Sequence, residues 1–306
     1  MKVLVTGGAG FIGSHVNQLL LDQGHMVTVI DDLSKGHRNS INPGVDFHQV
    51  NLENQTEIEK ILPGHDAVIH MASFIEVGES VQKPVEFAEN NIVGTVKLLE
   101  AMKNTGVTKI IFSSSACVYG APKNLPITEE DPSGEQENPY GITKVTMEQF
   151  CKLFHTLFNF DVTILRYFNP YGPGERHDPE THAIPNFIRA TLNREPVPLY
   201  WKGEQIRDFI FIDDLAEAHV LALTLSGLHI YNVGTENGNK VIDIVKKIFE
   251  LVGYEVPIND KGERKGDVPV LVASAEKIKK ELGWSAKVDL DDGLRKTIEF
   301  FKTNRL

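Results

Sequence analysis

The sequence lacks the features that define several protein classes. It holds only two cysteines in 306 residues, Cys117 and Cys151, and neither a CxxC nor an HExxH motif. We therefore expect no disulfide framework and no metal site. No apolar run approaches the roughly 20 residues needed to cross a bilayer, so we expect no membrane partner.

Positive charge is also scarce, since 31 Lys and Arg stand against 42 Asp and Glu and the net charge is −11. Nucleic acid affinity depends on neutralising phosphates with cations, so we expect no nucleic acid partner. The negative net charge does not exclude a small anionic ligand held by a few arginines. The N-terminal stretch reaches glycine at Gly7, too early for the apolar segment of a signal peptide, and this predicts a cytoplasmic protein.

The first half of the chain alternates between strand-like and helix-like patterns. Val- and Ile-rich strands separated by helices of 10–20 residues predict βαβ units and an α/β fold, a Rossmann-type doubly wound parallel sheet. A TIM barrel is the alternative, which a glycine cluster after the first strand disfavours. The expected strands are 2–6, 26–30, 47–50, 67–70, 109–113 and 162–166, and the expected helices are 11–23, 55–62, 85–104 and 140–159.

The pattern changes after about residue 170, where the turn-forming stretch NPYGPG is followed by shorter elements. We expect a Rossmann domain over 1–170 and a smaller α/β lobe over 171–306, with segments able to cross between them. The expected helices here are 185–193, 215–225, 241–252, 275–282 and 290–302, and the expected strands are 208–212 and 229–233.

A glycine cluster follows the first strand. In VLVTGGAGFIGSH, Gly7, Gly10 and Gly13 are spaced G-x-x-G-x-x-G at the start of a helix. Such glycines permit a tight turn, backbone approach to a pyrophosphate, and close helix–strand packing. Asp31 ends the second strand, where its carboxylate can accept the adenosine ribose hydroxyls and repel a 2′-phosphate. The pattern favours NAD over NADP, the alternative being a Rossmann turn that binds nothing.

A second group of polar residues lies further along the chain. Ser115 follows the predicted strand of IIFSSSACVYG, and Tyr140 and Lys144 of NPYGITK are four residues apart, on one helix face. A neighbouring lysine cation and the positive nicotinamide of a bound NAD both favour phenolate and should lower the tyrosine pKa from about 10. Serines at strand ends also satisfy turn backbone groups, and Tyr–Lys pairs occur on many helices, so these patterns alone leave the function open.

Taken together, these motifs resemble the extended short-chain dehydrogenase/reductase family, the branch of NAD-dependent sugar-nucleotide epimerases and dehydratases. The resemblance covers nearly the whole chain, and VGESVQKP with SSSACVYG is most similar to UDP-glucose (UDP-galactose) 4-epimerases. It is carried by VTGGAGFIGSH, VGESVQKP, NNIVGT, SSSACVYG, NPYGITK, LRYFNPYGP and RDFIFIDDLAEAH.

The resemblance implies reversible C4 epimerisation of a UDP-hexose, by transient oxidation to a 4-keto sugar with bound NAD. Tyr140 would take the proton of the 4-hydroxyl, Ser115 would hydrogen-bond the same oxygen, and Lys144 would also hold the nicotinamide ribose. The 1–170 domain would bind NAD and the 171–306 lobe the UDP-sugar. The resemblance also implies a homodimer formed through the helices over 85–104 and 140–159.

The resemblance assigns further binding residues. Arg207 and Arg264 match diphosphate-binding arginines, whose forked donors suit phosphate. The implied cofactor-binding residues are Gly7, Gly10, Phe11, Ile12, Gly13, Asp31, Asp32, Leu33, Ser34, Lys35, Gly36, Asn51, Leu52, Met71, Ala72, Ser73, Asn90, Tyr140, Lys144 and Phe168. The implied substrate-binding residues are Ser115, Tyr140, Asn169, His182, Ala183, Leu199, Tyr200, Arg207, Arg264 and Asp267.

Three positions depart from the family pattern. Asn51 replaces an aspartate that contacts adenine, Ile75 replaces a lysine of some 4-epimerases, and Leu271 lies where side-chain bulk influences tolerance for an N-acetyl group. UDP-N-acetylhexosamines and UDP-uronates therefore remain open as substrates.

Two other functions are disfavoured. A sugar-nucleotide 4,6-dehydratase needs an Asp-Glu pair where Ala116 and Cys117 stand, and a non-catalytic nucleotide-sensing regulator would have lost the Tyr or the Lys.

Overall fold

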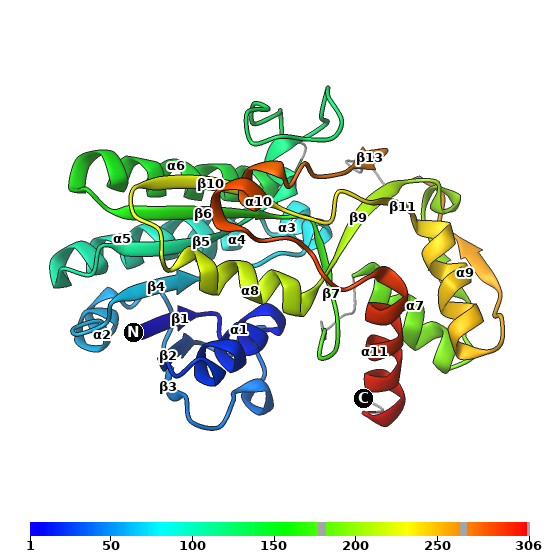
Figure 1. The fold of residues 1–306 in the computed structure, drawn as a ribbon, viewed down its shortest axis with the longest axis horizontal. Coiled ribbons are helices and arrows are strands. Elements are labelled where there is room, and N and C mark those ends of the chain that lie inside the picture. The colour runs from blue at the N-terminus through cyan, green and yellow to red at the C-terminus, as the bar shows by residue number, and fades with distance from the viewer. Residues whose placement is uncertain (137, 177–181, 264–267, 305–306) are drawn as a thin grey trace. The chain divides into compact units, whose positions relative to one another are not determined.

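A seven-stranded sheet forms the centre of the larger part of the chain (Figure 1). The computed structural model describes residues 1–136, 138–176, 182–263 and 268–304. The strand order is β10-β6-β5-β4-β1-β2-β3, so the chain moves outward from β1 in one direction and then from β4 in the other. The strands are β1 (Lys2–Thr6), β2 (Met26–Asp31), β3 (Asp46–Gln49), β4 (Ala67–His70), β5 (Lys109–Ser115), β6 (Asp161–Tyr167) and β10 (Leu228–Val233).

This sheet confirms the predicted Rossmann-type α/β fold. The pairs β1·β2, β1·β4, β2·β3, β4·β5 and β5·β6 are all parallel. The direction of strand succession reverses between β1 and β4, and ligands of such folds bind beyond the carboxyl ends of the strands at this switch point. The sheet therefore places the segments that follow β1, β2, β4 and β5 along one edge.

Helices connect the strands of this sheet. They are α1 (Phe11–Asp22), α2 (Gln55–Ile61), α3 (Val77–Gln82), α4 (Pro84–Phe87), α5 (Gly94–Thr105) and α6 (Pro139–Phe158), with the short 3₁₀ helices η1 (Arg38–Ser40) and η3 (Ala116–Tyr119). The single helix predicted over 85–104 is instead α4, the π-helix η2 (Ala88–Val93) and α5. Hydrophobic periodicity cannot reveal this interruption, because a π turn inserts only one residue into the repeat.

The helix α6 begins where its sequence predicts. Asn138 is the N-cap, and its side chain accepts a hydrogen bond from the Gly141 N–H at 2.8 Å. Pro139 occupies the first turn, where its missing N–H costs nothing. Asn159 ends the helix in the left-handed conformation, with φ of 56°. These caps set the register of the helix that carries Tyr140 and Lys144.

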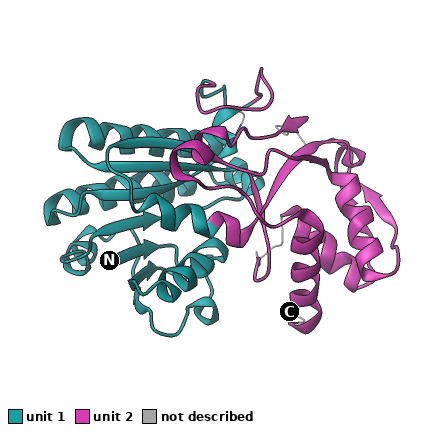
Figure 2. Ribbon diagram, viewed as in Figure 1, with its two compact units in different colours: residues 1–120, 132–167, 216–231 teal, residues 121–131, 168–215, 232–306 magenta. Residues whose placement is uncertain are grey.

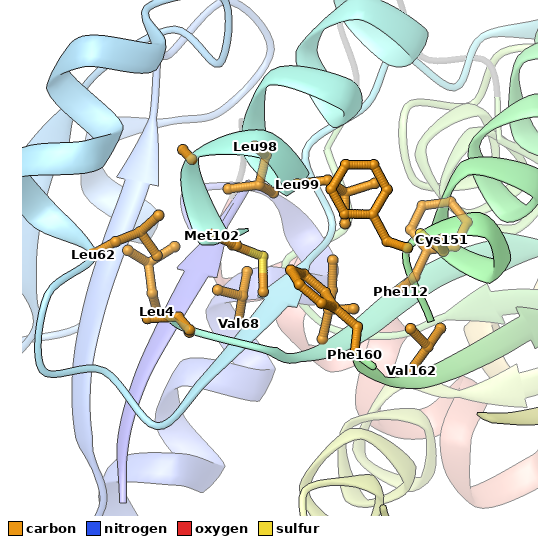
Figure 3. Packing of buried hydrophobic residues seen from close by; sticks show 14 of the residues in the cluster. Leu4, Leu62, Val68, Leu98, Leu99, Met102, Phe112, Cys151, Phe160 and Val162 are labelled. Atoms are coloured by element: carbon orange, nitrogen blue, oxygen red, sulfur yellow. The ribbon is translucent and has the colours of Figure 1, made fainter. Parts of the chain in front are cut away.

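One cluster of buried hydrophobic side chains lies between the sheet and the helices on one of its faces (Figure 3). Val68 of β4 and Ile110 of β5 are wholly buried and pack with Leu98 and Met102 of α5. Cys151 of α6 is buried in the same cluster. Strands buried on both faces carry continuous apolar runs, which explains why their positions are readable from the sequence.

The chain forms two compact units (Figure 2). The first comprises Met1–Gly120, Pro132–Tyr167 and Ala216–Tyr231, and the second comprises Ala121–Asp131, Phe168–Leu215 and Asn232–Leu306. The strand expected over 229–233 is β10, which joins the seven-stranded sheet although it follows residue 170. The division of roles between 1–170 and 171–306 stays a prediction.

Short elements make up most of the second unit. Strands β11, β9 and β13 form one sheet, in which β7 also pairs with β9, and β12 pairs with β8. Elements of two or three residues show no period, so the sequence predicted none of β7, β8, β11, β12 and β13. The elements are β7 (Asn169–Tyr171), α7 (Ala183–Leu192), β8 (Val197–Leu199), η4 (Trp201–Gly203), β9 (Ile206–Phe211), α8 (Ile212–Ala222), β11 (Gly238–Lys240), α9 (Val241–Val252), β12 (Ile258–Asp260), β13 (Val270–Leu271), α10 (Glu276–Leu282) and α11 (Leu290–Thr303).

Within the described ranges, no helix is long and apolar enough to span a membrane.

Candidate active site

The turn between β1 and α1 forms a backbone cradle. Gly7 has a left-handed φ of 73°, and its N–H donates to the Ile30 carbonyl at 2.9 Å. A Cβ on Gly7 would lie 2.6 Å from the Ala72 nitrogen, and Gly13 packs against the backbone of Gly7 and Gly8. Gly10 is the N-cap of α1 and has no side chain to cap it, so the first N–H groups of the helix are left available to an anion.

We expect Gly7→Ala to destabilise the fold more than Gly24→Ala does. Both positions have left-handed φ, at 73° and 77°, but a Cβ on Gly24 meets nothing within 4 Å. Gly24→Ala should therefore cost only the conformational strain of about 1–2 kcal/mol, whereas Gly7→Ala adds a backbone clash. Urea unfolding of both variants measures the difference. Equal destabilisation would show that the close approach to Ala72 imposes no constraint.

The loop after β2 is organised by two aspartates. Asp31 is buried, and its carboxylate accepts the N–H groups of Ala9 at 3.0 Å and Leu33 at 2.9 Å. Burial raises the pKa of Asp31, although these two backbone donors oppose the rise. Asp32 accepts from the hydroxyl of Ser34 at 2.6 Å and from the amide of Asn51 at 2.8 Å. An aspartate at position 51 would place its carboxylate beside that of Asp32, whereas the amide of Asn51 donates a hydrogen bond to it.

Lys144 is buried beneath the ends of β4 and β5. Its ammonium group donates to the Ser73 hydroxyl at 2.8 Å and to the Ser113 carbonyl at 2.9 Å. The nitrogen also lies 5.3 Å from the centre of the Phe112 ring and 5.9 Å from that of Tyr140. Burial lowers the pKa of Lys144 to about 8. The ammonium group is thus held rigidly and is less strongly protonated than a surface lysine.

Tyr140 and Ser115 lie together at the end of β5. The Ser115 side chain hydrogen-bonds the Tyr140 hydroxyl, and Tyr140 is 8% exposed. Burial raises the pKa of Tyr140 well above its usual value, and the thiol of Cys117 adds to the rise. In the chain by itself, the desolvation of the phenolate therefore dominates this pKa. The lowering expected from Lys144 together with a bound nicotinamide stays a prediction.

A buried ion pair supports this group and was not predicted. Glu148 accepts from Arg166 through both carboxylate oxygens, at 2.9 and 2.8 Å, and from the Ser114 hydroxyl at 2.6 Å. Arg166 also donates to the Tyr119 hydroxyl at 2.8 Å. Glu148 is four residues after Lys144 and Ser114 immediately precedes Ser115. The sequence signal that could have revealed Glu148 is its i,i+4 spacing from Lys144, since this spacing places both side chains on one helix face.

The π-helix η2 contributes a second unpredicted contact. The buried Asn91 side chain accepts from the Phe74 N–H at 2.7 Å and donates to the Phe74 carbonyl and the Thr143 hydroxyl, both at 3.0 Å. The predicted cofactor residue Asn90 donates its amide to Asn91 at 2.9 Å. Asn91 thereby ties the loop after β4 to the first turns of α6.

The remaining predicted cofactor residues of the first unit surround the same edge. Met71 and Ala72 donate their N–H groups to the carbonyl and the hydroxyl of Thr6, at 3.1 and 3.3 Å. Leu52 is buried and packs against Gly94. The segments that carry Gly7, Asp31, Ser73, Ser115 and Lys144 are thus brought together at the carboxyl ends of the strands.

The second unit carries the other predicted residues. Arg207 is 7% exposed, and its guanidinium donates to the carbonyls of Ile206 at 2.8 Å and Val268 at 2.7 Å. Asn169 donates its amide to the Asp208 carbonyl at 3.2 Å. The carbonyls hold the guanidinium in one orientation, which matters for a group that would bind a diphosphate.

The remaining predicted residues of this unit lie on short elements. The His182 imidazole lies 2.7 Å from a carboxylate oxygen of the buried Glu175. Ala183 starts α7, Leu199 ends β8, Tyr200 follows it and is partly exposed, and Phe168 is buried just before β7. Arg264 and Asp267 lie outside the described residues. The assigned roles of all these residues stay predictions.

The parallel sheet, the glycine cradle and the buried Asp31 are the parts of a dinucleotide-binding α/β protein, and the Ser115–Tyr140–Lys144 group lies at the same edge of the sheet. The sequence profile of the NAD dependent epimerase/dehydratase family matches residues 3–234, and the chain belongs to this family.

Three similar proteins support this assignment. A UDP-glucose 4-epimerase of Lactobacillus helveticus is 37% identical, over 99% of this chain and 98% of the relative. The crystal structure of a UDP-glucose 4-epimerase from Thermotoga maritima with UDP-glucose is 36% identical, with a TM-score of 0.95 and complete coverage of both chains. The structure from Bifidobacterium longum, in complex with NAD⁺ and UDP, is 34% identical with a TM-score of 0.95 and covers 100% of this chain and 99% of that one.

Proposed function

We propose that this chain catalyses the reversible C4 epimerisation of a UDP-hexose, interconverting UDP-galactose and UDP-glucose through a 4-keto sugar. The observation that carries the proposal is the group of Ser115, Tyr140 and Lys144 at the same sheet edge as the glycine cradle. Full-length relatives named UDP-glucose 4-epimerase agree with it.

The residues at the sheet edge fit NAD as cofactor. Gly7 and Gly13 leave no room for a Cβ and keep the turn tight, as a pyrophosphate-binding turn requires, and the buried Asp31 offers a carboxylate to ribose hydroxyls. Ser73 and Lys144 would hold the nicotinamide ribose. When bound, oxidised NAD would supply a reversible acceptor for the hydride of C4 and a positive charge that favours the Tyr140 phenolate.

The chain's own groups manage the proton. Tyr140 Oη takes the proton of the sugar's 4-hydroxyl and returns it to the 4-oxygen after the sugar has turned over. Ser115 Oγ, which already hydrogen-bonds Tyr140, holds the same oxygen. Lys144 Nζ, fixed by Ser73 and Ser113, supplies a positive charge near the phenolate. Burial favours the protonated phenol in the chain by itself. Tyr140 must therefore release this proton to solvent, which the positive charges of Lys144 and of bound NAD would favour, before it accepts the proton of the 4-hydroxyl.

The proposed uridine-diphosphate contacts come from the second unit. Asn169 and Arg207, with Arg264, would hold the diphosphate, and Asp267 would accept the uridine ribose hydroxyls. His182, Ala183, Leu199 and Tyr200 would line the sugar and uracil pockets. The carbonyl-held guanidinium of Arg207 supports its assignment, because a pre-oriented donor loses little entropy on binding phosphate.

A 4,6-dehydratase is disfavoured at this site. Ala116 and Cys117 follow Ser115, and neither offers a carboxyl group. Burial raises the pKa of the Cys117 thiol to about 11, so it stays protonated near neutral pH. UDP-N-acetylhexosamines and UDP-uronates remain the alternative substrates, because the proton-transfer group acts on C4 whatever the other substituents are.

Separate incubation with UDP-galactose, UDP-N-acetylgalactosamine and UDP-glucuronate, followed by chromatographic separation of the C4 epimers, tests the proposal. We expect UDP-glucose from UDP-galactose without accumulation of NADH absorbance at 340 nm. Absence of an epimer from all three substrates would refute it, and steady NADH formation would identify a dehydrogenase.

The proposal extends to a cytoplasmic homodimer. Val85 of α4, Val93 of η2, and Ile142, Leu153 and Leu157 of α6 are exposed apolar side chains on the helices predicted to form the interface. Burial of such side chains against a second copy is favourable. Sedimentation of the wild-type chain at micromolar concentration measures the assembly, and a monomer would refute the proposal.

A further inference from the structure

Two loops lie on either side of the glycine cradle. The loop after β2 is joined to it by the hydrogen bond from the His37 N–H to the Ala9 carbonyl at 3.0 Å. The loop after β4 approaches it from the opposite neighbouring strand, where the Ala72 nitrogen would lie 2.6 Å from a Cβ on Gly7. A dinucleotide that runs from Asp31 to Lys144 must therefore pass between these loops.

One side chain connects the two loops. The ammonium group of Lys35, in the loop after β2, lies 2.8 Å from the Glu79 carboxylate and 3.5 Å from that of Glu76. Glu79 belongs to the first turn of α3, and Glu76 is its buried N-cap residue. Lys35 also lies 5.9 Å from the centre of the Phe74 ring. Three groups of the segment after β4 thus face a single cation from the segment after β2.

We infer that Lys35, Glu76 and Glu79 form an ionic clasp that closes over the bound dinucleotide and slows its release. This inference rests on the proposed use of NAD. The clasp closes a ring of four segments, namely the cradle, the loop after β2, the loop after β4 and the first turn of α3. Release of the ligand through this ring requires the ion pairs to separate, so the pairs act on the dissociation rate.

The test is the release of NADH from the wild-type chain and from Lys35→Met. Protein loaded with NADH is mixed with excess NAD, and the loss of bound NADH fluorescence gives the dissociation rate. We expect release about three- to tenfold faster in the variant, because each partly exposed ion pair is worth a small factor. Added salt should speed release from the wild type and have little effect on Lys35→Met.

Lys83→Met is the matched control. Lys83 pairs with Glu79 at 3.2 Å and with Glu86 at 3.3 Å, but all three residues lie in the segment from α3 to α4, so these pairs do not join the two loops. The control should release NADH at the wild-type rate. Glu79→Gln should speed release, and combining it with Lys35→Met should add little beyond Lys35→Met alone, because both variants break the same contact.

The outcomes separate this inference from the proposed function. If the wild type binds NADH but Lys35→Met releases it at the wild-type rate, the clasp is refuted and the cofactor assignment stands. The same conclusion follows if Lys83→Met speeds release as much as Lys35→Met does. If the wild type binds neither NADH nor NAD, both proposals fail.

Discussion

Tyr140→Phe is expected to lower kcat for UDP-galactose epimerisation by about 10²- to 10⁴-fold. Phenylalanine keeps the ring that packs beside Lys144 but removes the hydroxyl that Ser115 contacts. Without it, no buried group at that position can take the proton of the 4-hydroxyl. Initial rates measured with saturating UDP-galactose give the change directly.

Tyr140→Phe should slow the chemical step without weakening cofactor binding or the stability of the fold. Tyr140→Phe should bind NADH and unfold at a temperature close to that of the wild type, because the ring and the contacts of Lys144 with Ser73 and Ser113 remain. Ser115→Ala should lose less, since the Tyr140 oxygen that takes and returns the proton remains. A wild-type rate for Tyr140→Phe would remove Tyr140 from the mechanism, whatever its neighbours do.

Glu148→Gln is expected to reduce the free energy of unfolding by about 3–5 kcal/mol. Gln retains the shape of the side chain but leaves the Arg166 guanidinium buried without an opposite charge, and arginine cannot neutralise itself. Lys152 lies 3.2 Å from the same carboxylate and would lose its partner too. Urea unfolding at neutral pH measures the loss.

The pH dependence of the free energy of unfolding shows whether the charge of Glu148 causes the loss. Burial would raise the pKa of Glu148, but Arg166 and Ser114 overcome burial and lower it. A carboxyl group whose folded pKa is depressed stabilises the protein above its unfolded pKa of about 4.3, and this stabilisation disappears as the pH falls through the folded value. The difference between wild type and Glu148→Gln should therefore shrink in acid.

The double variant Glu148→Gln/Arg166→Met is the control for packing. Removing both charges should recover part of the loss, because no unpaired buried charge remains. A double variant less stable than Glu148→Gln, together with a loss that does not change with pH, would assign the effect to packing and not to charge.

The sequence predicted the long elements of the fold well, and its failures have a physical cause. β1 and α9 have the predicted bounds, because buried strands and strongly amphipathic helices carry a clear period. The strand expected over 208–212 ends at Phe211, and Ile212 starts α8, since an apolar residue at a junction suits both elements. The π-helix η2 left no trace in the hydrophobic pattern.

In the candidate site, too, the sequence predicted one part and missed another. The residue types and the order of Gly7, Asp31, Ser115, Tyr140 and Lys144 are readable because each one lies shortly after a predicted strand or in the first two turns of a predicted helix. The contacts that hold them come from distant parts of the chain. Lys144 meets Ser73, 71 positions away, and Asn91 meets Thr143, 52 positions away.

By itself, the sequence determined the fold class, the family, and which side chains are available for proton transfer, because these depend on local period and residue order. Only the tertiary structure decided the state of those side chains. Burial, which depends on every surrounding element, raises the pKa of Tyr140 and lowers that of Lys144. Contacts between segments that are distant in the sequence form the ion pairs of Glu148 with Arg166 and of Lys35 with Glu79. Desolvation and long-range pairing arise from packing, and no local pattern of residues encodes them.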